Sequence, residues 1–236
     1  MATDPIETAD SDDVELRFEA RRCIHARACV LARPDVFVPN VVGPWLHPER
    51  ATADEIAALA HACPSGAITY RRKDGKPDER PPIVNLVRIR EHGPLAFHGD
   101  LRIAGEAERT RATLCRCGAS QHKPFCDGSH TAAGFQATGE PTTVDAPPLT
   151  ARAGELEIAP QHNGPLQVTG HLELVTGQRD GVGRHGGVGV ERRDLATHEV
   201  GGHVGLLGVG EDLDRLLTLG LAGLGEGGEF LLLPGT

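Results

Sequence analysis

The chain has 236 residues with 24 basic and 33 acidic side chains, so its net charge of -9 argues against binding driven by nucleic acid phosphates or anionic lipid. Its 30 Gly, 17 Pro and 3% aromatic residues favour two or more small, loop-rich units over one large core. The start, MATDPIETADSDD, lacks the basic and apolar parts of a signal peptide, and no apolar stretch of about 18 residues occurs, which predicts a soluble protein of the cytoplasm.

The first segments of the chain predict a leader and then a strand. Residues 1–13 are acidic and polar, and we expect them to be disordered. The stretch VELRFEARR, Val14 to Arg22, alternates in the manner of a β-strand that leads into Cys23.

A helix is predicted within ATADEIAALAHAC. Thr52 and Glu55 stand at the spacing of a capping box, which marks a helix start. Apolar residues then recur at helical spacing, so one face of the helix is apolar and ends at a cysteine. These residues are Ile56, Leu59, Ala60 and Cys63.

The stretch KDGKPDERPP, Lys73 to Pro82, is charged and rich in Pro and Gly, and it predicts a linker between two units. Beyond it the pattern is one of short strands and turns. Two stretches spaced 71 residues apart, GPLAFHGDLRI from Gly93 and GPLQVTGHLEL from Gly164, match at several positions and suggest a duplicated β unit. The second copy lacks cysteines, and 16 of the 30 glycines follow from Gly181, so a decayed or frameshifted copy and a native tail both remain open.

Three of the six cysteines and a histidine lie within LCRCGASQHKPFCDGSH. The candidate ligands are Cys115, Cys117, Cys126 and His130, spaced C-x-C-x8-C-x3-H, and a reducing compartment favours a metal site over a disulfide. Zinc suits three cysteines and a histidine chemically. However, structural zinc sites usually separate paired cysteines by two to four residues, and only one intervenes here, so the spacing favours iron and sulfide.

The whole stretch, with its ending Cys126-Asp127-Gly128-Ser129-His130, resembles the CDGSH iron-sulfur family. The resemblance implies a 2Fe-2S cluster with Cys115 and Cys117 on one iron and Cys126 and His130 on the other. It also implies that Asp127, Ser129 and Lys123 orient the ligands, although Lys123 equally suits a solvated surface position. Proteins of this family commonly pair two such units, within one chain or as a homodimer, and both arrangements stay open.

The remaining cysteines lie in CIHARAC, Cys23 to Cys29, and in CPSG, which begins at Cys63. A ferredoxin loop has the spacing C-x2-C-x2-C with a distant Cys-Pro, and here Ala26 stands at the middle position. Residues from about 14 to 71 are nevertheless similar to a divergent monocluster ferredoxin family that often occurs fused to CDGSH units. Three thiolates suit a 3Fe-4S cluster, or a 4Fe-4S cluster whose fourth iron takes His25, another side chain or solvent; three buried structural cysteines are the alternative.

These observations predict an α+β protein that transfers single electrons to a redox partner protein. No G-x-S-x-G, acid-base pair or nucleotide-binding glycine motif is present, so we expect no enzymatic activity. Cluster storage, transfer or redox sensing and a zinc-stabilised interaction module are the alternatives. The expected divisions are a leader (1–13), a ferredoxin-like domain (14–72), a linker (73–82), a β-rich CDGSH domain (83–140), a degenerate second β unit (141–178) and a glycine-rich tail (179–236).

Overall fold

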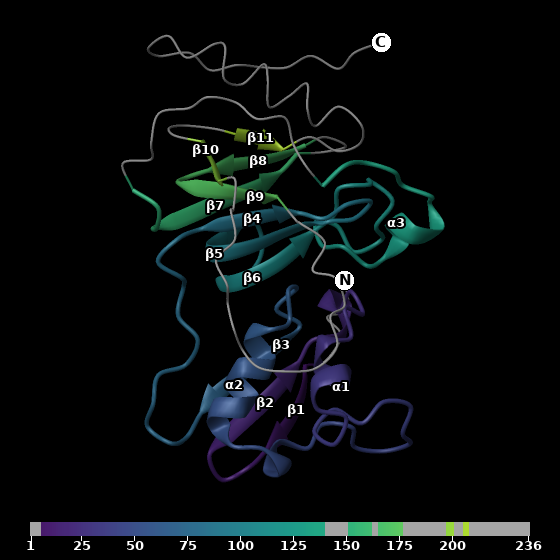
Figure 1. Cartoon of the computed structure of the whole chain (residues 1–236), viewed down its shortest axis with the longest axis vertical. Coiled ribbons are helices and arrows are strands. Elements are labelled where there is room, and N and C mark those ends of the chain that lie inside the picture. The colour runs from purple at the N-terminus through teal and green to yellow at the C-terminus, as the bar shows by residue number, and fades with distance from the viewer. Residues whose placement is uncertain (1–5, 140–150, 162–164, 177–196, 201–204, 208–236) are drawn as a thin grey trace.

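The computed structural model describes residues 6–139, 151–161, 165–176, 197–200 and 205–207. Helices and strands both occur in this part of the chain, in agreement with the predicted α+β class. The strands form two separate sheets, and Figure 1 shows the N-terminal sheet with its helices below the larger second sheet. Among the described residues, no helix is long and apolar enough to cross a bilayer.

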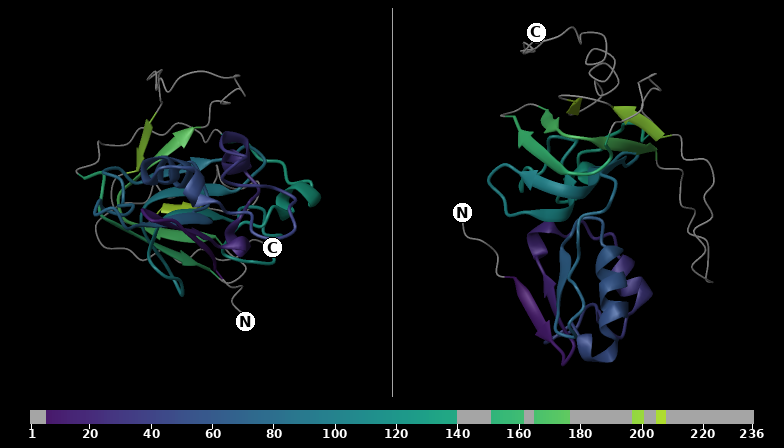
Figure 2. Two further views of the ribbon diagram at one scale, coloured as in Figure 1. Left: turned by 90° about the horizontal axis from the view of Figure 1, so that it is seen from below. Right: turned by 90° about the vertical axis from the view of Figure 1, so that its left-hand side faces the viewer.

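The N-terminal sheet has three antiparallel strands, and α2 packs against one of its faces (Figures 1 and 2). Its centre is β2, whose Val14 and Leu16 are fully buried among apolar side chains of α2 and the following loops. The elements are β1 (Glu7–Asp10), β2 (Val14–Phe18), η1 (Ala20–Arg22), α1 (Ala28–Ala32), η2 (Pro48–Arg50), α2 (Ala53–His61) and β3 (Ile68–Arg72).

Helix α2 begins as its sequence predicted. The Thr52 hydroxyl accepts a hydrogen bond from the Glu55 backbone N–H, and the Glu55 carboxylate accepts one from the Thr52 backbone N–H, which confirms the capping box. Ile56, Leu59 and Ala60 are buried on its apolar face. Cys63 follows the helix end and is partly buried, so the helix delivers this thiol to the edge of the core.

Two N-terminal predictions are wrong in part. Residues 7–10 of the expected disordered leader form β1, because their backbone pairs with β2 and the Glu7 carboxylate accepts a hydrogen bond from Trp45 Nε1 at 2.8 Å. The strand predicted to run to Arg22 ends at Phe18. The chain then tightens into a 3-10 turn in which Arg21 and Arg22 both reach back to Glu19.

The second sheet contains the remaining strands and has its own core, formed by residues such as Phe97, Leu101, Leu114 and Leu156. Strand β5 lies at its centre and carries a β-bulge between His98 and Leu101. The elements are β4 (Leu86–Ile89), β5 (Leu95–Ile103), β6 (Arg109–Leu114), α3 (Ser129–Ala132), β7 (Glu155–Pro160), β8 (Leu166–Thr169), β9 (Leu172–Thr176), β10 (Thr197–Val200) and β11 (Gly205–Leu207). Of the predicted glycine-rich tail, all but 197–200 and 205–207 lies outside the described residues.

The two repeated stretches occupy equivalent places in this sheet. Strand β5 pairs with β4 in an antiparallel register, and β8 pairs with β7 in the same register displaced by 71 residues. The paired residues at the ends are Leu86 with His98 and Ile89 with Leu95 in the first copy, and Glu157 with Thr169 and Pro160 with Leu166 in the second.

The two copies also exchange strands. The second half of β5 runs parallel to β7, with Arg102 opposite Glu157, and β9 runs parallel to β4, with Glu173 opposite Leu86. These two pairings are related by the same displacement of 71 residues, so the copies interlock about an approximate two-fold axis. The segments predicted as a CDGSH domain and a second β unit therefore share one sheet, and the loop after β6 leaves it at one side (Figure 1).

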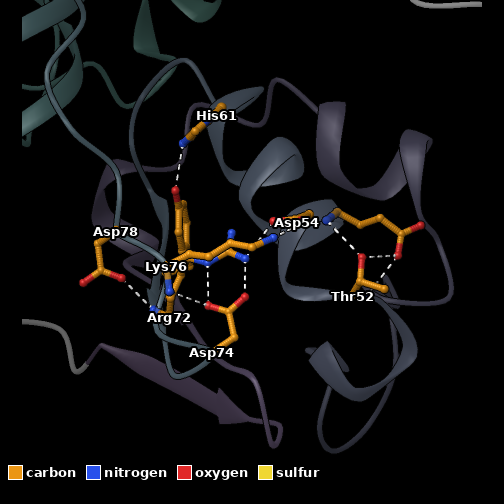
Figure 3. Close-up of polar contacts among 9 residues, drawn as sticks. Thr52, Asp54, His61, Arg72, Asp74, Lys76 and Asp78 are labelled. Carbon is orange, nitrogen blue, oxygen red and sulfur yellow. Dashed lines mark hydrogen bonds and ion pairs between the residues drawn. The ribbon is translucent and has the colours of Figure 1, made fainter.

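The segment 73–82, which the sequence analysis assigned as a linker, is held against the N-terminal unit by polar contacts (Figure 3). Lys76 Nζ lies 2.8 Å from an Asp54 carboxylate oxygen at the start of α2, and Asp78 accepts a 2.6 Å hydrogen bond from the Arg72 backbone N–H. At its end, Glu79 forms an ion pair with Arg111 of β6, in the second sheet. The segment therefore contacts both units instead of spanning solvent between them.

Candidate metal centres

The C-x-C and C-D-G-S-H parts of the motif meet at the end of β6. The Cys115 backbone N–H donates to the Pro124 carbonyl at 2.8 Å, and the Cys126 N–H donates to the Thr113 carbonyl at 3.0 Å. These two bonds pair the chain around Pro124 antiparallel to the end of β6, with Leu114 opposite Phe125, so Cys115 and Cys126 lie diagonally across the pair on one face. Gly128, at a φ of +87°, then turns the chain into α3, which carries His130.

The four predicted ligands of this motif lie in two pairs. Cys115 Sγ is 3.8 Å from Cys117 Sγ, and Cys126 Sγ is 3.5 Å from His130 Nδ1. Within the described part of the chain, no three His, Cys, Asp or Glu side chains converge on a point where one metal ion could bind. The arrangement is thus one of neighbouring pairs, not of four ligands around a single point.

Backbone N–H groups point at the sulfur atoms of both motifs. Three sulfur atoms each lie 3.4 Å from the backbone nitrogen two residues further on, and in all three cases the N–H donates. Such donors stabilise a thiolate and tune the potential of a metal bound to it. The pairs are His25 N with Cys23 Sγ, Ala119 N with Cys117 Sγ and Gly128 N with Cys126 Sγ.

Ser120 and Asp127 brace the loop between the ligands. The buried Ser120 hydroxyl donates to the Phe125 carbonyl at 2.6 Å and accepts from the His122 N–H at 3.1 Å. The Asp127 carboxylate accepts from the backbone N–H groups of Gln121, at 2.8 Å, and Ser129, at 2.9 Å. These bonds outweigh the effect of burial, which alone would raise the Asp127 pKa, and they hold that pKa far below its usual range.

The backbone bond from Ser129 to Asp127 lies between the two ligand positions Cys126 and His130, and Lys123 is exposed. The other histidine of the motif, His122, is also exposed.

Burial disfavours the thiolate form of two cysteines of the CDGSH motif, Cys115 and Cys126. Burial raises the pKa of Cys126 to about 11, the neighbouring thiols of Cys115 and Cys117 add to this, and the Gly128 N–H opposes it. Burial likewise raises the pKa of Cys115. A metal or cluster that binds these sulfur atoms as thiolates must displace protons, so binding weakens as the pH falls.

The N-terminal cysteines come from three different places. Cys23 follows η1, Cys29 lies in α1, and Cys63 follows α2, with its sulfur 3.5 Å from the Ser65 hydroxyl. Burial raises the pKa of both Cys23 and Cys29, and the Cys63 thiol raises each further. All three cysteines are partly exposed and free of disulfides.

Two residues of the CIHARAC loop have a left-handed backbone conformation. His25 and Arg27 adopt positive φ angles of 53° and 62°, which are uncommon for residues other than glycine. Ala26, which stands where a ferredoxin loop has its middle cysteine, is exposed, as is His25.

Two arginines that the sequence analysis did not single out connect the two cysteine sites. Arg22, next to Cys23, places its guanidinium carbon 4.1 Å from the centroid of the Phe125 ring, next to Cys126. Arg111 of β6 donates to the Cys63 carbonyl at 2.5 Å. Arginines in a strand or before a cysteine are usually surface residues, so nothing in the local pattern marked these two; only their burial does.

Comparison with protein families agrees with both motifs. Residues 9–73 match the family described as a divergent 4Fe-4S mono-cluster, and residues 92–131 match the family described as an iron-binding zinc finger of the CDGSH type. No match was found among curated proteins or among solved structures. The chain therefore carries, in the order that its motifs predicted, a region of the divergent 4Fe-4S mono-cluster type followed by an iron-binding CDGSH region.

Proposed function

We propose that this chain is a redox protein that holds a 2Fe-2S cluster on Cys115, Cys117, Cys126 and His130 and transfers single electrons. A second cluster, of the 3Fe-4S or 4Fe-4S type, would be held by Cys23, Cys29 and Cys63 in a ferredoxin-like N-terminal domain. Each cluster would supply one-electron chemistry, and the protein would supply the ligands, the N–H donors to sulfur and the burial that tune the potential.

The pairing of the CDGSH ligands is the observation that carries this proposal. A tetrahedral metal ion with bonds of about 2.3 Å to sulfur and about 2.0 Å to nitrogen separates two sulfur ligands by about 3.8 Å and a sulfur and a nitrogen by about 3.5 Å. The observed separations are 3.8 Å for Cys115 with Cys117 and 3.5 Å for Cys126 with His130. Two pairs at these distances suit two metal ions better than one zinc ion, which would need all four ligands at such distances from one another.

The N-terminal set suits a cluster with an incomplete protein ligand set. Cys23, Cys29 and Cys63 would provide three iron ligands, and the exposed His25, whose backbone N–H donates to Cys23 Sγ, is the nearest candidate for a fourth along the chain. Water is the alternative, because the loop around Ala26 is exposed.

We propose electron transfer without enzymatic catalysis, because one-electron transfer is the chemistry that iron-sulfur clusters commonly supply. The external partner would be another redox protein, and the cytoplasm, being reducing, would keep the thiols free. Storage or transfer of the 2Fe-2S cluster is a second candidate, favoured by the partial exposure of Cys117 and His130, which leaves one side of the site open to an acceptor.

Anaerobic purification followed by analysis of iron, acid-labile sulfide and zinc tests the proposal directly. We expect two spectroscopically distinct iron-sulfur centres in EPR of the oxidised and reduced protein. A colourless protein that contains zinc instead would contradict the redox function. Mixing the loaded protein with a metal-free acceptor ferredoxin tests the second candidate, since rapid movement of the cluster to the acceptor would favour storage and transfer.

A further inference from the structure

The residues that flank the ligands of one site touch those that flank the ligands of the other. Arg22 and Cys23 are consecutive, as are Phe125 and Cys126. The Arg22 side chain is only 2% exposed, and its guanidinium lies on the Phe125 ring at 4.1 Å. Its Nη2 also donates to Glu106, in the turn between β5 and β6, at 2.9 Å. A buried cation that is shared between an aromatic ring and a carboxylate fixes the relative position of the segments it joins.

A second contact fixes the loop that carries Cys63. The Arg111 guanidinium donates to the carbonyl groups of Ala60, Cys63 and Ile68. It therefore binds both the end of α2 and the start of β3. In return, the loop approaches the Arg111 backbone so closely that a Cβ on Gly66 would lie 2.6 Å from the Arg111 carbonyl oxygen. Strand β6, which bears Arg111, continues directly into Cys115.

We propose that the two cysteine sites form an electron-transfer pair within one chain, joined across the Arg22–Phe125 contact. The inference rests on the proposed function and adds to it the partner of the N-terminal site, which is the CDGSH site of the same molecule. Arg22, Phe125 and Arg111 are positioning residues: they hold the two ligand sets at one separation. No bond forms or breaks in the transfer.

The ligand chemistry favours one direction of transfer. A neutral imidazole in place of an anionic thiolate makes a cluster less negative and raises its potential. This favours the site of His130 as the electron acceptor of the pair. The site of Cys23, Cys29 and Cys63 would be the donor, and an external one-electron reductant would resupply it.

The test uses the full chain loaded with both clusters. A photoreduced flavin delivers less than one electron per chain in a flash, and rapid-freeze EPR follows how the electron redistributes between the two centres. We expect the redistribution rate to be independent of protein concentration, because both centres lie in one molecule. A rate that rises in proportion to protein concentration would overturn the inference while leaving the proposed function intact.

Variants test the contact itself. Phe125→Leu removes the ring but keeps an apolar side chain, and we expect slower redistribution and weaker magnetic coupling between the two reduced centres, with both EPR signals retained. Phe135→Leu is the matched control, because its ring lies beside Arg116, at 5.5 Å, within the β unit alone. Equal rates and couplings in the two variants would overturn the role of Phe125. Absence of either centre from the wild-type protein, shown by iron and sulfide counts, would overturn the proposed function and this inference together.

Discussion

Arg111 and Glu79 form a two-bonded ion pair where the two sheets meet, with Nε to Oε1 at 2.7 Å and Nη2 to Oε2 at 2.6 Å. The side chains are 3% and 12% exposed, so the pair is largely withdrawn from water. Glu79 comes from the segment between the units and Arg111 from β6, and the same guanidinium also binds carbonyl groups of the N-terminal unit. The pair therefore neutralises the charge that anchors one unit to the other.

We predict that Glu79→Gln destabilises the protein by about 3 kcal/mol, because it leaves the Arg111 charge buried without a counterion. Asp54→Asn is the control, since the Asp54 carboxylate pairs with Lys76 and Arg72 but is 66% exposed, so its loss should destabilise the protein much less than the loss of Glu79. Urea unfolding of wild type and both variants, in the same state of cluster loading, measures the difference. Equal losses in the two variants would contradict the anchoring role.

The same ion pair predicts a pH dependence. Burial alone would raise the Glu79 pKa, but the hydrogen bonds and charge of Arg111 outweigh it and lower that pKa from its usual value of 4.5. A lowered carboxyl pKa contributes stability that is present above the unfolded pKa and is lost as the pH falls through the folded pKa. The stability gap between wild type and Glu79→Gln should thus be full at neutral pH and shrink below about pH 4.5. Unfolding curves of both proteins across this range test it, and a constant gap would rule out the charge as its cause.

Gly66 allows the close approach of the Cys63 loop to β6, and we predict that Gly66→Ala loosens it. The residue has a φ of +66°, which costs an alanine about 1–2 kcal/mol, and the new Cβ would meet the Arg111 carbonyl oxygen at 2.6 Å. Gly75→Ala is the control, since Gly75 has a φ of +81° but nothing within 4 Å of the added Cβ. It carries the cost of the positive φ without the close contact. We expect the loss of stability in Gly66→Ala to exceed that in Gly75→Ala. We also expect Cys63 to be alkylated faster in Gly66→Ala than in the wild-type protein, and no faster in Gly75→Ala.

Local patterns in the sequence predicted the elements that depend on local interactions. The capping box at Thr52 and Glu55 and the apolar spacing of Ile56 and Leu59 identified α2, because both involve residues one turn apart. The 71-residue repeat likewise anticipated two stretches in equivalent registers. The spacing within the CDGSH motif predicted four candidate ligands, and these lie in two close pairs.

Contacts between distant residues could not be predicted in this way. The exchange of strands between the two copies depends on how β5 and β7 pair. The local sequence pattern of each stretch would be the same whether or not the strands were exchanged. The partners of Arg111 lie 32 to 51 residues away, so a charged strand residue gave no sign that it joins two units. The short β1 was missed because two of its four side chains are acidic and three are exposed; its backbone pairing and the bond from Trp45 to Glu7 hold it.

Cys63→Ala should abolish the signal of the N-terminal cluster and spare that of the 2Fe-2S cluster. The substitution removes the sulfur but keeps the backbone carbonyl that Arg111 binds, so the contact between the units survives. Cys115→Ala is the reciprocal variant and should have the opposite effect. Iron and sulfide counts with EPR measure both. Loss of both signals in a soluble Cys63→Ala protein would show that the two sites do not assemble separately.

His130 should make the 2Fe-2S cluster sensitive to protons. Its imidazole nitrogen can bind either iron or a proton, so protons compete for the ligand as the pH falls, and colour is lost in mild acid. A neutral ligand also leaves the cluster less negative than a thiolate would. We therefore predict that His130→Cys lowers the reduction potential, on the order of 100 mV, and slows the loss of visible colour at mildly acidic pH.

The control for this variant is His122→Gln, because His122 lies in the same motif but is exposed and 8 residues before His130 in the sequence. It should leave both the potential and the colour unchanged, and matched circular dichroism should show that all three proteins are folded. The Nδ1 atom of His130 is 3.5 Å from Cys126 Sγ, a separation that suits two ligands of one iron. If His130→Cys had the wild-type potential and the wild-type rate of colour loss across the acid range, that proximity would be packing alone, and the fourth ligand would have to come from elsewhere.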